Sequence, residues 1–248
     1  MIEEIRDIQT RAGEMETFIV HPDRNGPHPV VFLLMDAPGI REELYDMTRR
    51  LGTVGYYVVL PNLYYRAGKD TKYGPDVTTK GSAEQARMRA VRTKMTIPPV
   101  MDDIADLLAF TDTQKAAKQG PVGAHGYCMS GPYALAAAAR YPDRVAAAAS
   151  FHGGRLATDQ LDSPHLLSPQ MRGEIYVGVA GIDPHFLPEE RRRLETALQT
   201  AGVRNTVEVY PDVKHGFAVY DTPVYDRTAA ERHWQRLLKF FATNLSWP

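Results

Sequence analysis

Short apolar runs alternate with helical patterns along most of this chain, and this alternation constrains the fold more than any other feature. An apolar run without polar alternation is typical of a parallel strand covered on both faces. These runs occupy residues 29–35, 56–60, 122–126, 145–151, 174–180 and 206–210. The helical patterns between and after them occupy residues 41–51, 102–110, 132–140, 188–201 and 226–244. The pattern predicts an α/β fold with a mainly parallel, doubly wound sheet, which binds ligands at the carboxyl ends of its strands.

Two segments depart from this alternation. Residues 4–10 and 14–20 mix apolar and polar side chains around Ala12-Gly13, which predicts two antiparallel edge strands. Residues 66–99 are polar and rich in turn-forming residues, with one helix expected to begin at Ser82 through a capping box with Gln85. We interpret residues 66–99 as an insertion over the active site of a single domain spanning residues 1–248.

Composition limits which partners the protein can bind and indicates in which cellular compartment it works. Lys and Arg total 29 against 30 for Asp and Glu, so the chain lacks the positive field that nucleic acids and anionic membranes attract. One cysteine excludes an internal disulfide, and the polar residues at the start do not resemble a signal peptide. Apolar runs are too short to span a bilayer. We expect a cytoplasmic monomer or small homo-oligomer that acts on a small molecule.

That cysteine, Cys128, stands in the sequence Gly-Tyr-Cys-Met-Ser-Gly at residues 126–131, between an apolar run and an alanine-rich helical pattern. A nucleophile at a tight strand-to-helix turn needs small neighbours two positions away on each side, because the strand and the helix come close there. A free cysteine is more often inert core. The flanking strand and helix favour the nucleophile elbow here.

Candidate partners for Cys128 follow in the chain. A thiol attacks carbonyl groups as thiolate, so it needs an imidazole to take its proton and a third group to orient that imidazole. Asp183 follows the apolar run 174–180, and His215 follows the run 206–210. Nucleophile, acid and histidine in this order match the α/β-hydrolase arrangement. Taken alone, Asp183 is a turn-forming Asp-Pro and His215 a surface histidine; His185 is the strongest rival base.

An oxyanion hole completes such a site, because charge that develops on the carbonyl oxygen needs preorganised donors. We expect one donor to be the backbone N–H of Met129, which follows the nucleophile. The other is the N–H of Ala37, in the loop after the run 29–35, since Pro38 has no N–H.

These motifs resemble the dienelactone hydrolase (carboxymethylenebutenolidase) family of α/β hydrolases over nearly the whole chain. Besides the elbow, the similar phrases are residues 55–64, Gly181-Ile182-Asp183 followed by Pro188, and His215-Gly216-Phe217. The resemblance implies a triad of Cys128, Asp183 and His215, oxyanion donors Ala37 and Met129, and no metal or organic cofactor.

The chain also departs from the family pattern. The family's glutamate that controls the cysteine proton corresponds to Asp36, which is one methylene shorter, and the third elbow glycine corresponds to Ser130. An arginine that holds the substrate carboxylate is replaced by Val219, which cannot neutralise that charge. Arginines in the insertion offer an alternative anion contact, although a solvated helix face is the simpler interpretation: Arg87, Arg89 and Arg92.

We therefore expect a hydrolase that cleaves lactones or small carboxylic esters through a thioester on Cys128. Tyr64, Tyr127 and Phe217, with Asp36, are candidate substrate or gating residues, although aromatic residues near a core are more often packing. Two other classes stay open: an acyltransferase that uses the same cysteine with a thiol or hydroxyl acceptor, and a hydrolase fold retained as a binding module.

Overall fold

Strands and helices follow the expected alternation in a computed structural model that describes residues 1–68 and 70–245. Lys69, within the predicted insertion, and residues 246–248, within the predicted domain, lie outside the described residues. The chain divides into two units, Met1–Gln119 and a second that begins at Gly120, and each is described by itself.

The first unit contains the predicted antiparallel pair. Its strands are β1 (Ile2–Thr10), β2 (Gly13–His21), β3 (Val30–Leu34) and β4 (Tyr57–Pro61), in the spatial order β1-β2-β4-β3. β1 and β2 are antiparallel, β2 and β4 are antiparallel, and β3 and β4 are parallel. β1 is thus the edge strand, while β2 joins it to the parallel pair. Gly13 turns the chain between them with a φ of 131°, a conformation that glycine adopts without strain.

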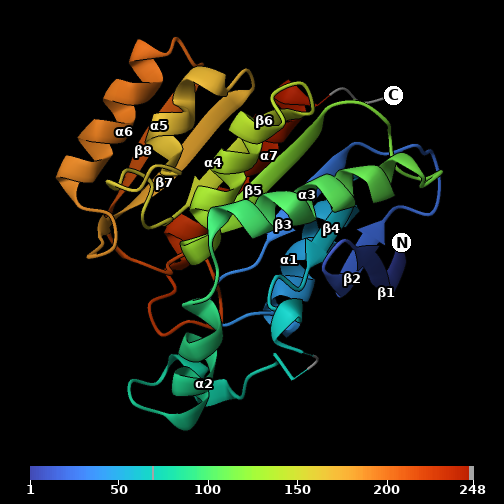
Figure 1. The fold of residues 1–248 in the computed structure, drawn as a ribbon, viewed down its shortest axis with the longest axis horizontal. Helices are drawn as coiled ribbons and strands as arrows, with labels where there is room; N and C mark the ends of the chain where they lie inside the picture. The colour runs from blue at the N-terminus through green and yellow to red at the C-terminus, as the bar shows by residue number, and fades with distance from the viewer. Residues whose placement is uncertain (69, 246–248) are drawn as a thin grey trace. The chain divides into compact units, whose positions relative to one another are not determined.

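The helices of this unit are α1 (Glu42–Val54), α2 (Ala83–Arg92) and α3 (Ile97–Asp112), with 3-10 turns η1 (Tyr65–Ala67) and η2 (Pro75–Thr78). The helix expected at Ser82 is confirmed: the Ser82 hydroxyl accepts the N–H of Gln85, whose side chain in turn accepts the N–H of Gly81. α2 packs on η2, away from the strands of its unit (Figure 1). α3 begins earlier than expected because its prolines occupy the first turn, where a missing N–H breaks no helical bond.

The second unit carries four parallel strands in chain order: β5 (Val122–Tyr127), β6 (Val145–Phe151), β7 (Glu174–Ile182) and β8 (Asn205–Lys214). Its helical segments are η3 (Cys128–Ser130), α4 (Gly131–Arg140), α5 (Pro164–Leu167), η4 (Ser168–Gln170), α6 (Pro188–Thr200) and α7 (Arg227–Asn244). Parallel strands with helical connections put the carboxyl ends of all four strands at one edge. Loops at that edge hold the residues considered below.

α4 and α7 cover opposite faces of the strands of the second unit (Figure 1). Successive residues of a strand point to opposite faces. Ser150 of β6 accordingly lies against Gly131 of α4, and Phe151 stacks its ring edge on His233 of α7, with the ring centroids 4.2 Å apart. The two helices thereby bury both faces of β6.

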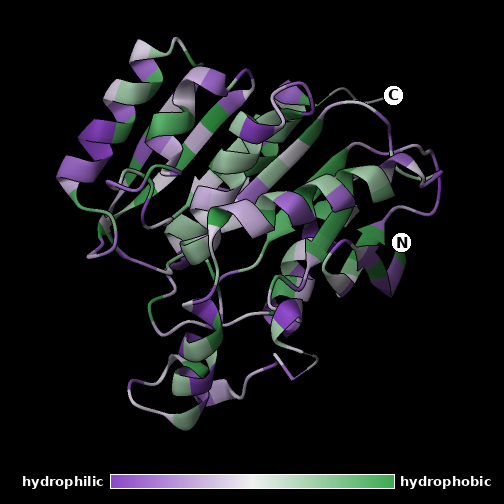
Figure 2. Ribbon diagram, viewed as in Figure 1, coloured by the Kyte–Doolittle hydropathy of each residue, from purple (hydrophilic) through white to green (hydrophobic). Residues whose placement is uncertain are grey.

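Apolar colour in Figure 2 runs along β3 and β4, whereas the outer side of α6 is hydrophilic. All five residues of β3 and all five of β4 are buried, as expected for strands covered on both faces. None of the helices in residues 1–68 and 70–245 has the length and apolar character needed to cross a membrane.

Candidate active site

Cys128 occupies a sharp turn between β5 and α4. Its φ is 54°, in the left-handed region that non-glycine residues rarely adopt, and the side chain is half-buried. Backbone strain of this kind persists where the surrounding structure holds it, and it gathers at functional positions. The predicted elbow is thus present as a backbone conformation.

The small neighbours of Cys128 are required by space. A Cβ on Gly126 would lie 2.1 Å from the carbonyl oxygen of Ser130, and one on Gly131 would lie 2.8 Å from Cα of Gly153. Ser130, where the family pattern has glycine, adopts an ordinary helical φ of −93°. A serine therefore fits there without strain.

Asp183 and His215 are brought together by the register of β7 and β8. Ile182 pairs with Lys214, so the next residue of each strand meets the other at the carboxyl edge. Nδ1 of His215 lies 2.8 Å from Oδ2 of Asp183. The Asp183 side chain is 1% exposed and that of His215 is 18% exposed, so the pair is largely shielded from water. The two residues predicted from chain order are in contact.

The electrostatics of this pair favour an imidazolium. Burial lowers the pKa of His215, but hydrogen bonding to Asp183 and to Cys128, together with their negative charge, outweighs burial and raises the pKa to about 10. Nε2 of His215 is buried and has no aligned hydrogen bond to any described residue. Cys128 is therefore near the ring without forming a bond of ordinary geometry in this state.

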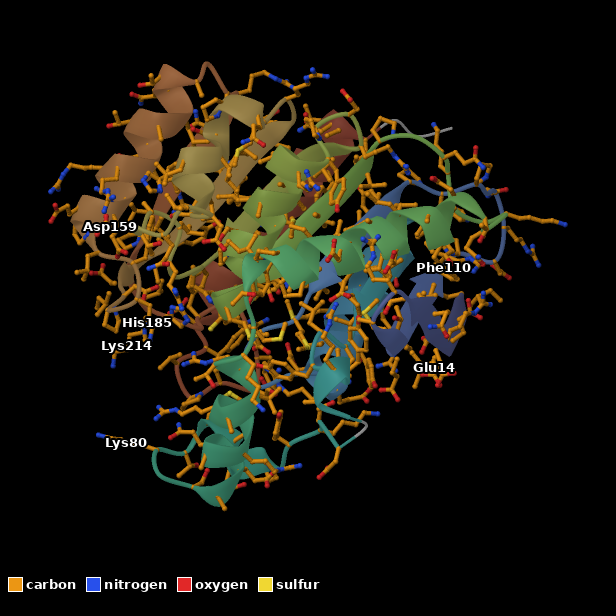
Figure 3. All side chains as sticks on the ribbon, viewed as in Figure 1. Glu14, Lys80, Phe110, Asp159, His185 and Lys214 are labelled. Atoms are coloured by element: carbon orange, nitrogen blue, oxygen red, sulfur yellow. The ribbon has the colours of Figure 1, made fainter. Side chains whose placement is uncertain are left out.

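His185, the rival base, has a different place. Its backbone N–H donates to Oδ1 of Asp183 at 2.8 Å, so it fixes the second oxygen of the carboxylate. Its ring stands edge-on to the ring of His215, with the centroids 4.8 Å apart. Figure 3 shows His185 and Lys214 at the same rim of the second unit. The residue that pairs with Asp183 through its ring is His215.

His152, which the sequence analysis did not single out, lies beside His215. It follows β6, is 1% exposed and has a φ of 38°. Its ring is edge-on to those of His215 and Phe217, at centroid distances of 5.1 Å and 5.5 Å. Neither ring nitrogen has a hydrogen-bond partner among the described residues. A histidine directly after a buried strand and before Gly153-Gly154 is the signal that could have indicated it.

In the first unit, Asp36 is held by Arg41 through two bonds, Nη1 to Oδ1 at 2.6 Å and Nη2 to Oδ2 at 2.9 Å. Arg41 also donates to the carbonyl oxygen of Gly39. The neighbouring Ala37 is fixed through its carbonyl oxygen, which accepts the hydroxyl of Tyr64 at 2.8 Å. The loop expected to supply an oxyanion N–H is thus braced within its own unit, and both oxygens of Asp36 are occupied by a cation.

The three aromatic candidates are buried: Tyr64 is 1% exposed, and Tyr127 and Phe217 are 0% exposed. The Tyr127 hydroxyl pairs with Nε2 of His233 at 2.7 Å, and Phe217 stacks on Tyr210. In these contacts the aromatic side chains pack within the protein, and the role of the three residues in substrate binding stays a prediction. Met129, the second expected oxyanion residue, follows Cys128 in η3.

Val219 is fully buried in the turn after His215, where its N–H donates to the carbonyl oxygen of Gly216. In the predicted insertion, Arg87 is paired with Asp70 and Glu84, which are acidic neighbours in the same segment. No group of three or more His, Cys, Asp or Glu side chains in the described part of the chain is arranged to hold a metal ion.

Comparisons with known proteins identify the family to which the chain is similar. The model of the dienelactone hydrolase family matches residues 15–245. A carboxymethylenebutenolidase of Rhodococcus opacus is 28% identical over 225 residues, covering 89% of this chain and 83% of its own length. An Escherichia coli protein assigned as a carboxymethylenebutenolidase is 28% identical over 242 residues, covering 94% of this chain and 84% of its own length.

Among solved structures, a Klebsiella pneumoniae protein assigned as a dienelactone hydrolase superposes with a TM-score of 0.85 at 22% identity. The match covers 97% of this chain and 98% of that one, which supports the α/β-hydrolase fold expected from the sequence. With a family match that spans most of its length and an elbow, acid and histidine in the expected order, this chain belongs to the dienelactone hydrolase family of α/β hydrolases.

Proposed function

We propose that this protein hydrolyses lactones or small carboxylic esters through a thioester on Cys128, with His215 as acid and base and Asp183 orienting its ring. One observation carries most of this proposal: His215 is bonded to Asp183 at 2.8 Å and has its pKa raised to about 10 by Asp183 and Cys128 against the effect of burial. An imidazolium beside a sulfur on a strained turn is the arrangement that supports a thiolate nucleophile.

The first half of the reaction forms the thioester. The thiolate sulfur of Cys128 bonds to the carbonyl carbon, and the oxygen of that carbonyl takes the negative charge. When the charge returns to the carbon, the bond to the leaving oxygen breaks, and Nε2 of His215 gives that oxygen its proton. In a lactone the leaving hydroxyl stays tethered to the acyl group, so acylation opens the ring without releasing a product.

Backbone donors would stabilise the charged oxygen in this step. We assign the N–H of Met129 and the N–H of Ala37 to this role, on the basis of their places after the nucleophile and after β3. Tyr64 supports the assignment of Ala37, since the hydrogen bond from its hydroxyl to the Ala37 carbonyl oxygen holds the loop after β3 in place. Removal of one oxyanion donor typically costs about 10²–10³-fold in kcat.

The second half releases the acid. Water gives a proton to Nε2 of His215, and its oxygen bonds to the thioester carbon. The carbon–sulfur bond then breaks, which restores the thiolate, while the imidazolium is again ready to protonate the next leaving group. No metal or organic cofactor takes part in these steps.

Val219 narrows the substrate class. A buried aliphatic side chain in the turn after His215 cannot neutralise a carboxylate, so we propose that substrates are uncharged near this residue. We further propose that the protein works in the cytoplasm as a monomer or small homo-oligomer on small-molecule substrates.

The proposal is tested by trapping the acyl enzyme. Wild type and Cys128→Ala are mixed with a panel of charged and uncharged esters and lactones, quenched in acid, and digested for mass spectrometry of the peptide that contains residue 128. We expect acyl mass on the wild-type peptide only, most of it from uncharged substrates. Because the chain has one cysteine, a thiol reagent reports the same site independently. Acyl mass on the variant, or on another peptide, would overturn the assignment of the nucleophile.

A further inference from the structure

The loop after β6 approaches the elbow closely. The N–H of Gly154 lies 3.4 Å from the carbonyl oxygen of Cys128, and a Cβ on Gly153 would lie 3.1 Å from Cα of Gly131. The same loop begins at His152, whose backbone N–H donates to the carbonyl oxygen of Gly178 in β7. His152 is therefore fixed at the carboxyl edge of β6, on a loop that contacts the nucleophile's own peptide.

The ring of His152 has no partner for its polar atoms. Both nitrogens are buried, and neither is hydrogen-bonded within the described residues. An unsatisfied buried polar atom destabilises the folded state, whereas a phenyl ring would fill the space without that cost. The backbone adds strain, because a φ of 38° lies in the left-handed region that residues other than glycine rarely adopt. Unpaired ring nitrogens at this buried position favour a hydrogen-bond partner that is not part of the protein.

The catalytic imidazole is the neighbour of this ring. Nε2 of His215 is buried without an aligned partner, and the rings of His152 and His215 are in edge-to-face contact, with the centroids 5.1 Å apart. A buried water needs two to four polar partners, and ring nitrogens from two adjacent imidazoles meet that requirement. We propose that His152 and His215 together bind the water that hydrolyses the thioester, with His152 as its positioning residue.

This inference rests on the proposed function and deepens its second half. The water donates one hydrogen to Nε2 of His215, which removes that proton, and the other to a ring nitrogen of His152. An oxygen lone pair is then free to bond to the thioester carbon, and the carbon–sulfur bond breaks to return the thiolate. His152 must be neutral to accept a hydrogen, and burial, with the charges of His215 and His233, lowers its pKa well below the usual range.

Three variants separate this role from simple packing. His152→Phe keeps a ring and removes both nitrogens, and His152→Asn keeps an acceptor and tolerates a positive φ. If His152→Phe does not fold, His152→Ala takes its place. His125→Phe is the matched control, because His125 is another buried imidazole whose ring nitrogens have no partner among the described residues, and it packs on Phe241 of α7.

Acylation and deacylation are measured separately with one uncharged ester. For His152→Phe we expect kcat to fall on the order of 10- to 100-fold, as for a misplaced reactant, with kcat/KM within about twofold of wild type. The thioester on Cys128 should accumulate, as a burst of alcohol and as acyl mass. His152→Asn should recover part of kcat, and His125→Phe should not accumulate thioester.

The outcomes distinguish the two proposals. Equal deacylation rates in wild type and His152→Phe, with thioester formed in both, overturn the water site alone. A fall of kcat and kcat/KM by the same factor also overturns it, because the role would then be structural. Absence of thioester from every variant and from wild type overturns the proposed function itself.

Discussion

Buried polar side chains are treated differently in the two units of this protein. In the first, buried carboxylates are paired: Asp36 with Arg41, and Asp103 with Arg66 and the Tyr65 hydroxyl at 2.6 Å. In the second, the buried imidazoles of His125 and His152 have no hydrogen-bond partner among the described residues.

The difference follows from what each group can do when it is buried. A carboxylate in an apolar interior must be paired, because the cost of removing its charge from water is large. An imidazole can lose its proton instead, and burial lowers the pKa of His125 to about 3. Paired carboxylates hold loops in place, whereas a buried imidazole stays neutral without a charged partner. The ring of His125 packs edge-on to Tyr127 and Phe241.

The largest expected effect is loss of the base in the second unit. His215→Gln keeps a polar side chain but cannot exchange a proton, so we expect kcat/KM for an uncharged ester to fall by about 10³–10⁴-fold. Thermal unfolding of the purified variant should stay close to that of wild type. A fall of less than about tenfold would remove His215 from the reaction and blur the contrast between the units.

The raised pKa of His215 predicts an alkaline limit. Above about pH 10 the imidazolium loses the proton that the leaving oxygen needs, so kcat/KM should fall about tenfold for each further pH unit. The free energy of unfolding that His215 contributes should also fall at alkaline pH. The folded pKa lies above the ordinary value of 6.5, so this contribution is complete below pH 6.5 and is lost as the pH rises through about 10. A kcat/KM profile and urea unfolding at pH 7 and above pH 10 check both. A profile that stays flat to pH 11 contradicts the raised pKa.

Breaking a pair in the first unit should affect stability rather than chemistry. Asp103→Asn leaves the Arg66 guanidinium without its counter-ion, and we expect unfolding to become easier by roughly 1–3 kcal/mol. The neighbouring Asp102→Asn is the matched control, because Asp102 and its partner Arg11 are both 52% exposed, and exposed pairs contribute about 0–1 kcal/mol. Equal midpoints of urea unfolding in the two variants would contradict the importance of buried pairing.

The smallest effect concerns Tyr127. Tyr127→Phe removes the hydroxyl bound to His233 and should cost about 1 kcal/mol of stability, with kcat and KM unchanged. An increase in KM at unchanged stability would instead support the role in substrate binding suggested by the sequence. Urea unfolding and steady-state kinetics on the same preparation decide between these outcomes.

Much of the fold could be predicted because apolar runs and helical periodicity are local properties. The bounds of β6 match the prediction, and Asp226 caps α7 as the last helical pattern suggested. The predicted end of β8 was wrong, because the strand runs to Lys214, four residues beyond the end of the predicted apolar run at residue 210. Pro211 and Asp212 are typical of a turn, but here they form an irregular stretch in which Asp212 has a φ of 61°. Only pairing with β7 shows that the strand continues.

The candidate site was accessible to sequence reasoning where spacing carries the information. Cys128, Asp183 and His215 each follow an apolar run, and parallel strands bring such positions together. The pairing of Asp36 with Arg41 and the orphaned ring of His152 were not accessible. Both depend on side-chain direction and on neighbours from other elements, which a single sequence does not specify.

The glycine contacts at the elbow limit how this enzyme can be re-engineered. Any side chain at Gly126, Gly131 or Gly153 meets backbone atoms within about 3 Å, so a combinatorial library that varies these codons will consist largely of misfolded members. Diversity is better directed to exposed positions at the same rim, such as His185 and Arg155, where a new side chain has room. Directed evolution can therefore change the exposed rim of the site, whereas the glycines that surround the turn at Cys128 have to be kept.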